Sequence, residues 1–340
     1  MKRFNKNLLT MLLVVLVAFS LAACGTKSDK NGGTNDITNG TTNDITEGAA
    51  NGENDTTGES VELPTEDRAG NTVTIPKEVN KIISLAPSTT QILFDLGVGD
   101  KLVAVDTQSP LYATIPSEVL QFDMMAPDLE QVIALSPDVV FVSSMTNFSG
   151  EDILKGVRDS GICVLEIPTS NSIEDIKKDI SFVADSVGKS QEGKVLISDM
   201  EAIINEVSEI GSKITDKKTV LFEIAAAPDI YSFGKNVFLN EMIELIGATN
   251  ILAEQEGWIS VSGEAIVSKN PDVILTNVNY IENPTEEIKS RDGFNEITAV
   301  VNDRVYYIDN GYSSLPNHNV IKALIEMAKA VYPEQFADLK

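Results

Sequence analysis

Two stretches of the chain, residues 127–141 and 261–275, follow the same pattern. Each places a glutamate at the start of a short amphipathic segment, then a Pro-Asp pair, then a run of aliphatic residues. Glu264 stands 134 residues after Glu130, and Pro271 stands 134 residues after Pro137. A helix start, a turn and a buried strand are thus predicted twice at one spacing, which indicates two similar halves.

Short apolar runs rich in β-branched residues alternate with amphipathic stretches in both halves. This alternation predicts an α/β fold with mainly parallel sheets. In the first predicted helix, Ser88 and Gln91 have capping-box spacing and Gly97 marks the end. A hairpin with a strand at 72–76 is expected to precede it. The expected strands lie at 81–86, 101–106, 138–144 and 162–167, and then at 219–224, 230–233, 272–277 and 304–309.

Two long helical patterns separate the halves. One apolar stripe runs from Ile173 to Val187 before Gly188, and a second runs from Leu196 to Ile210 before Gly211. The roughly 20 residues before Gly211 would span about 30 Å as a helix. We therefore expect an N-terminal α/β lobe at 61–187, a linking helix at 188–213 and a C-terminal α/β lobe at 214–340.

The N-terminus is similar to a bacterial lipoprotein signal. A basic start is followed by an apolar run too short to span a membrane, and then by LAAC, which resembles a lipobox. The resemblance implies a signal peptide at 1–23 and a lipid on Cys24, which would hold the protein at the outer face of the cell membrane. An ordinary secretory signal is the alternative. Residues 24–60 have the composition of a flexible acidic linker.

The formal charge of −25 becomes −28 once Lys2, Arg3 and Lys6 leave with the signal. Such a charge argues against a nucleic-acid partner and against broad adhesion to anionic lipid. Cys163 would then be the one cysteine besides Cys24, so no internal disulfide is expected, and we interpret Cys163 as buried and inert.

The sequence shows no constellation for catalysis. His318 is the single histidine of the sequence, whereas a zinc carrier usually needs several histidines and a Ser-His-Asp triad would depend on this one residue. The sequence also contains no P-loop, HExxH or CxxC motif. We therefore expect no enzyme and no catalytic cofactor. His318 precedes a predicted helix, where an exposed structural role is the simpler interpretation.

The folded part, about residues 61–335, resembles the substrate-binding proteins of ABC importers for iron complexes, haem and corrinoids. The resemblance is carried by DRAGNTVTIP, KIISLAPSTTQILFDLGVGDKLVAV, APDLEQVIALSPDVVF, VSGEAIVSKNPDVIL and FNEITAVVNDRVYYID, in that order. It implies two α/β lobes joined by a backbone helix, with a ligand cleft between them. It also implies that the protein, as a monomer, delivers a small-molecule metal complex to a membrane permease with a cytoplasmic ATPase.

Within that family, one glutamate on each lobe contacts permease arginines, and Glu130 and Glu264 match these positions. If Asp128 and Ser262 are N-caps, each glutamate is the second residue of its helix, while Leu129, Val132 and Ile133 would face inward. Acidic residues also favour first helical turns through the helix dipole, which is the alternative explanation. Two carboxylates in register suit a two-fold partner.

The ligand is less well defined. DMMAPDLE resembles the haem-binding branch, in which a methionine before the Pro-Asp motif ligates iron, and the matching residue is Met125. The histidine of that branch is replaced by Asn279, so Tyr280 or His318 would have to substitute. Alternatively, Met124 and Met125 fill an apolar gap.

Further cleft candidates are aromatic residues and one helix start. Ser88 would receive an anionic group, or act only as an N-cap. Haem or a related iron complex is the first expectation, and cobalamin or another corrinoid the second. Arg and Lys residues are sparse at these loop positions, which disfavours a highly anionic ferric siderophore. A surface sensor or adhesin without transport is the alternative from another class. The aromatic candidates, which would stack on a macrocycle, are Tyr112, Phe148, Tyr231, Trp258 and Tyr312.

Overall fold

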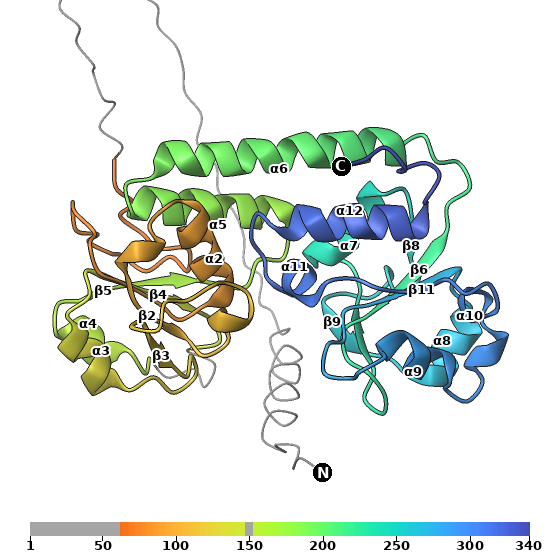
Figure 1. Ribbon diagram of the computed structural model, residues 1–340, viewed down its shortest axis with the longest axis horizontal. Helices are drawn as coiled ribbons and strands as arrows, with labels where there is room; N and C mark the ends of the chain where they lie inside the picture. The colour runs from red at the N-terminus through yellow and green to blue at the C-terminus, as the bar shows by residue number, and fades with distance from the viewer. Residues whose placement is uncertain (1–61, 147–151) are drawn as a thin grey trace, which may run out of the picture.

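The computed structural model describes residues 62–146 and 152–340, which form two α/β lobes beside a pair of long helices (Figure 1). The signal peptide, Cys24, the linker and Phe148 lie outside the described residues. The predicted two-lobe α/β fold is confirmed.

The first lobe contains a parallel five-stranded sheet with the order β3-β2-β1-β4-β5. Side chains alternate across it, so Ile82 packs in one buried cluster and Ile83 in another on the opposite face. Burial on both faces explains why these strands are continuously apolar. The elements are β1 (Ile82–Ser84), α2 (Pro87–Asp95), η2 (Gly99–Lys101), β2 (Leu102–Asp106), η3 (Ser109–Leu111), β3 (Leu120–Phe122), α3 (Leu129–Leu135), β4 (Val139–Ser143), α4 (Lys155–Asp159) and β5 (Cys163–Ile167).

The second lobe contains a parallel four-stranded sheet with the order β11-β10-β6-β8 and an antiparallel β7-β9 ribbon. Its helices cover both faces of that sheet, as in the first lobe (Figure 1). The elements are β6 (Thr219–Glu223), β7 (Tyr231–Phe233), α7 (Phe238–Leu245), β8 (Thr249–Asn250), β9 (Trp258–Ser260), α8 (Gly263–Lys269), β10 (Val273–Thr276), α9 (Pro284–Lys289), η4 (Phe294–Glu296), α10 (Thr298–Val301), β11 (Val305–Tyr307), α11 (Asn310–Ser314) and α12 (Val320–Val331).

The helices α5 (Ile173–Ser186) and α6 (Ser190–Gly211) run along one side of the molecule and join the lobes (Figure 1). The 22 residues of α6 correspond to about 33 Å. Helix α12 of the second lobe also packs on α6. One buried apolar cluster contains Leu93, Met200 and Leu324, and so extends from the first lobe through α6 into the second. The lobes therefore share a continuous core.

The repeated sequence pattern forms the same local structure twice. Asp128 and Ser262 are N-caps whose side chains accept hydrogen bonds from the backbone N–H three residues later. Each seven-residue helix ends at a left-handed residue followed by the Pro-Asp pair. Asp138 Oδ2 then accepts from the N–H groups of residues 80 and 81, and Asp272 Oδ2 from Thr219 N and Oγ1. The Pro-Asp pair thus ties each helix to the start of a neighbouring strand.

Three local predictions are wrong. Helix α2 begins at Pro87 with Ala86 as its N-cap and has no side-chain cap, so Ser88 is not an N-cap. Ile133 is 36% exposed rather than facing inward, because a helix this short buries only Val132 fully. Residues 72–76 form no strand, since Thr72 makes only an isolated antiparallel bridge to Glu66.

Candidate functional site

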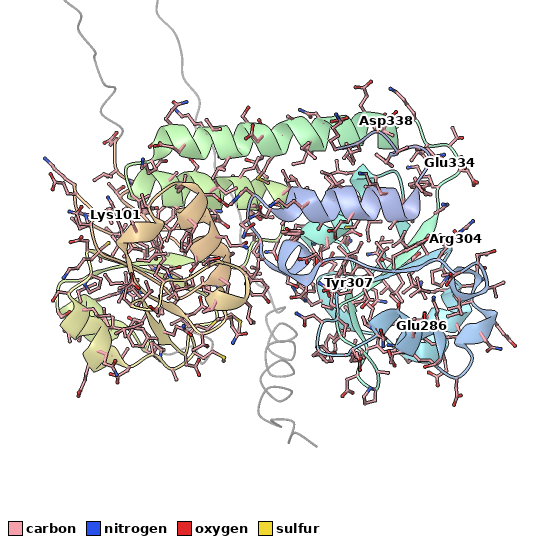
Figure 2. The ribbon with its side chains drawn as sticks, in the orientation of Figure 1. Lys101, Glu286, Arg304, Tyr307, Glu334 and Asp338 are labelled. Carbon is pink, nitrogen blue, oxygen red and sulfur yellow. The ribbon has the colours of Figure 1, made fainter. Side chains whose placement is uncertain are left out.

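The C-terminal ends of both sheets point toward the space between the lobes. Figure 2 shows Lys101, just before β2, at the outer side of the first lobe, and Arg304, just before β11, at the outer side of the second. Tyr307, the last residue of β11, lies nearer the middle. Because the strands of the five-stranded and four-stranded sheets are parallel, the loops that follow these strands lie on this inner side. In open α/β sheets, ligands bind outside the carboxyl ends of the strands.

A buried polar network holds the loop after β2. Asp106 Oδ1 accepts hydrogen bonds from Gln108 N and Ser109 N at 2.8 and 2.9 Å, and Ser109 Oγ donates to Asp106 Oδ2 at 2.5 Å. Burial raises the pKa of Asp106, against the lowering effect of these donors. The network fixes the backbone that leads into Leu111 and Tyr112.

Tyr112 joins the two lobes. Its hydroxyl donates to Asn310 Oδ1 at 3.2 Å, while Asn310 Nδ2 donates to the carbonyl of Asn277 after β10. The ring lies against Gly311, where a Cβ atom would be 3.0 Å from Tyr112 Cδ1. The predicted candidate Tyr112 therefore lies where the lobes meet.

Two exposed apolar residues flank this contact. Leu111 is 69% exposed on the first lobe, and Tyr307 is 44% exposed on the second. The Tyr307 hydroxyl accepts a hydrogen bond from Asn310 N at 3.3 Å, which connects it to the Tyr112 contact. The sequence analysis missed both residues. Tyr307 could have been noticed as an aromatic residue at the end of a predicted strand, whereas no local pattern singled out Leu111.

The aromatic candidates on the second lobe have several structural roles. Trp258 packs edge-on against the buried Phe233, with ring centroids 5.9 Å apart, and Tyr231 begins the paired strand. The Tyr280 hydroxyl accepts a hydrogen bond from Ala226 N at 2.9 Å. The ring of Tyr312 lies 4.9 Å from the Lys322 ammonium. These residues brace the loops of the second lobe.

His318 is not exposed, contrary to the prediction. It is buried at 8% exposure, and its Nε2 lies 2.6 Å from Asp95 Oδ2 on the other lobe. This hydrogen bond is the main reason that the pKa of Asp95 is lowered. These contacts are those of a structural residue, as the sequence analysis expected. His318 is buried because it pairs with Asp95, which is distant in the sequence.

The methionines and Asn279 follow strands on the inner side. Met124 packs against the core cluster of the first lobe, whereas Met125 is half-buried and outside that cluster. Asn279 is exposed after β10. Ser88 is half-buried in the first turn of α2, and its carbonyl oxygen accepts a bond from Asn317. Within residues 62–146 and 152–340, no group of three His, Cys, Asp or Glu side chains is arranged to hold a metal ion.

Glu130 and Glu264 are both exposed. Their helices, α3 and α8, lie on different lobes and on the side of the molecule opposite α6 (Figure 1). A hydrogen bond from its own backbone N–H lowers the pKa of Glu264. Cys163 is half-buried rather than buried as predicted. Burial still raises the pKa of its thiol to about 11, which is consistent with an inert cysteine.

Of the helices that the structure describes, none has the length and apolar character needed to cross a membrane. Two hollows of about 530 and 480 Å³ lie away from the inner loops. The larger lies between α5, α6 and α7, and the smaller lies beside β5.

Comparison with known proteins agrees with this architecture. The model of the periplasmic binding protein family matches residues 82–312. An ABC transporter substrate-binding lipoprotein of Bacillus subtilis, YvrC, is 34% identical over 278 residues, covering 80% of this chain and 86% of that protein. A vitamin B12-binding protein of Vibrio parahaemolyticus is 26% identical, covering 74% of this chain and 89% of that protein.

A solved structure shows the same fold at a similar level of identity. It is a possible iron-binding, periplasmic solute-binding protein from Staphylococcus epidermidis, with a TM-score of 0.67 and 30% identity, and the match covers 75% of this chain and all of that one. The resemblance found in the sequence is therefore confirmed. The chain belongs to the periplasmic binding protein family and is a substrate-binding component of an ABC transporter.

Proposed function

We propose that this protein captures a preformed organic metal complex, haem or another iron chelate, between its lobes and delivers it to a membrane permease. The observation that carries this proposal is the pair of exposed apolar side chains, Leu111 and Tyr307, on either side of the Tyr112–Asn310 bond. An apolar macrocycle gains free energy by covering such surfaces, while a simple ion or a small anion does not.

The remaining inner loops suit an organic complex in the same way. Tyr280 and Trp258 are half-buried on the second lobe, and Met125 is half-buried on the first. His318 is held by Asp95, and the Tyr280 hydroxyl is held by Ala226 N. Both side chains are thus oriented by contacts within the protein. If haem binds, Met125 would be its protein ligand, since a thioether is a known axial ligand of haem iron.

Titration of the soluble chain, residues 25–340, tests the proposal. Haemin, cyanocobalamin and a ferric siderophore are added separately, and binding is followed by absorbance and calorimetry. We expect one complex to bind at a one-to-one ratio with a Kd at or below about 1 μM, equivalent to about −8 kcal/mol. Failure of all three to bind would contradict the proposed function.

The two methionines provide a matched test of iron ligation. Met125→Ala is expected to remove the shift of the haem Soret band and to weaken haemin binding at least about tenfold. Met124→Ala shortens a side chain that packs on the core, so it should lower the melting temperature and leave the Soret band unchanged. An unaltered spectrum in Met125→Ala would show that Met125 does not ligate the iron.

Replacing the exposed apolar pair tests the ligand surface. Leu111→Ser with Tyr307→Ser is expected to weaken binding of the preferred complex about 10- to 100-fold, because each side chain would lose apolar contact with the ligand. Val301→Ser is the control, since Val301 is 66% exposed but lies on α10, outside the inner loops. Equal affinities in all three proteins would place the ligand elsewhere.

A corrinoid is the second candidate ligand. The relative that binds vitamin B12 in Vibrio parahaemolyticus matches 74% of this chain, so the shared fold accommodates such a ligand. Tight binding of cyanocobalamin without binding of haemin would favour it, and the apolar pair would then contact the corrin ring.

Docking would place the exposed glutamates Glu130 and Glu264 against basic residues of the permease. Their helices, α3 and α8, have the same length and each has a side-chain N-cap. Both helices lie on the same side of the molecule (Figure 1). A lipid on Cys24 would hold the receptor at the extracytoplasmic face of the membrane, as the name of the Bacillus subtilis relative implies for that protein.

A further inference from the structure

A line of polar residues joins the lobes beside the proposed ligand site. Gln91 and Asp95 lie four residues apart on α2, and so on one face of that helix. They meet Asn317 and His318, which are consecutive residues just before α12. Asn317 Nδ2 donates to Gln91 Oε1 at 2.6 Å, and His318 Nε2 lies 2.6 Å from Asp95 Oδ2. We call these four residues the α2 seam.

The two residues that the second lobe contributes to the α2 seam, Asn317 and His318, are buried. Asn317 is fully buried, and its Oδ1 also accepts a hydrogen bond from Asn319 N at 2.8 Å. His318 is nearly buried, and its Nδ1 has no hydrogen-bond partner within the described part of the chain. The charged neighbours on this side are Asp95 and Lys322, whose positive charge also lowers the pKa of Asp95. Separating the lobes would break the Asn317–Gln91 and His318–Asp95 hydrogen bonds, which opposes that movement.

The α2 seam also connects directly to the ligand side of the lobes. Gln91 Nε2 donates to the carbonyl of Tyr112 at 3.0 Å, so one amide group contacts both Asn317 and the loop that carries Leu111. Tyr112 in turn donates to Asn310. A shift of one lobe at the α2 seam would therefore move Leu111 relative to Tyr307.

We propose that the α2 seam is an interlobe latch that fixes the spacing of the two halves of the ligand site and slows release of the bound complex. The proposal rests on the proposed function for its effect on the ligand, but the fixed spacing does not depend on any ligand. Gln91, Asp95, Asn317 and His318 act as positioning residues, since they would not touch the complex themselves.

Spin-label distances test the spacing without a ligand. The soluble chain carries Cys163→Ser, with labels at Lys155→Cys on α4 and Glu286→Cys on α9, which are exposed sites on different lobes. With the α2 seam intact we expect one narrow distance distribution. The double variant Gln91→Ala with His318→Ala should give a broader distribution. The single variant His318→Gln, which retains Gln91 and keeps a donor for Asp95, should give a distribution nearly as narrow as that of the intact α2 seam.

Release kinetics test the effect on the ligand. For whichever of haemin or cyanocobalamin binds, Gln91→Ala with His318→Ala should speed dissociation at least about tenfold and change association less than about threefold. Distance distributions equal to that of the intact α2 seam would overturn the latch, and so would faster release with unchanged distances. Thermal melting confirms that each variant is folded. If haemin, cyanocobalamin and the ferric siderophore all fail to bind, the proposed function fails, while the distances still decide the latch.

Discussion

Reversing both docking charges, Glu130→Arg with Glu264→Arg, is expected to reduce transport in liposomes containing the cognate permease to less than about one hundredth of the wild-type rate. Each substitution would place a cation against a basic partner, and like-charge contacts at an interface cost several kcal/mol. Ligand affinity should stay unchanged, because α3 and α8 lie on the outer side of the lobes (Figure 1).

Asp199→Arg with Glu206→Arg is the matched control. Both residues are exposed on α6, on the side of the molecule opposite α3 and α8 (Figure 1), and the substitution makes the same change in net charge. Transport by this variant should stay close to the wild-type rate. Normal transport by the Glu130 and Glu264 variant would refute docking through these residues and favour a surface sensor or adhesin.

Gly211→Ala is expected to lower the free energy of unfolding by about 3 kcal/mol or more, or to prevent soluble expression. A Cβ atom at Gly211 would lie 2.1 Å from the carbonyl oxygen of Leu245 and 2.9 Å from the backbone nitrogen of Gly247. Both are main-chain atoms, so no side-chain rotation relieves the overlap. Helix α6 would have to move away from α7, and the continuous core between the lobes would open.

Gly156→Ala is the control for that substitution. Gly156 lies within α4, and a Cβ atom there meets nothing within 4 Å among residues 62–146 and 152–340. Alanine should be neutral or stabilise the protein by up to about 1 kcal/mol, because glycine is a poor helix former. Urea unfolding compares the two variants. Equal stability of Gly211→Ala and the wild type would show that α6 does not pack this closely.

The sequence predicted the fold well where local signals agreed. Strands buried on both faces read as apolar runs, and the long stripes ending at Gly188 and Gly211 became α5 and α6. The caps Asp128 and Ser262 were predictable because a side chain three residues from its donor is a local feature. The α2 cap was mistaken because Pro87 already begins the helix, which moves Ser88 inside it.

The site was harder to predict, because its residues depend on contacts between distant segments. The burial of His318 follows from Asp95, 223 residues earlier in the chain, and no local pattern reveals that pair. The importance of Gln91 likewise comes from Asn317 on the other lobe. Leu111 looked like an ordinary loop residue, and only its exposure beside the lobe contact makes it a candidate.

Hydrogen–deuterium exchange with and without the metal complex tests most directly whether the complex binds between the carboxyl ends of the two parallel sheets. We predict slower exchange on binding in the inner loops of both lobes, at residues 107–113, 224–231, 277–281 and 308–317, with no change in α4 or α10. Protection confined to one lobe, or centred on the hollow between α5, α6 and α7, would contradict this account.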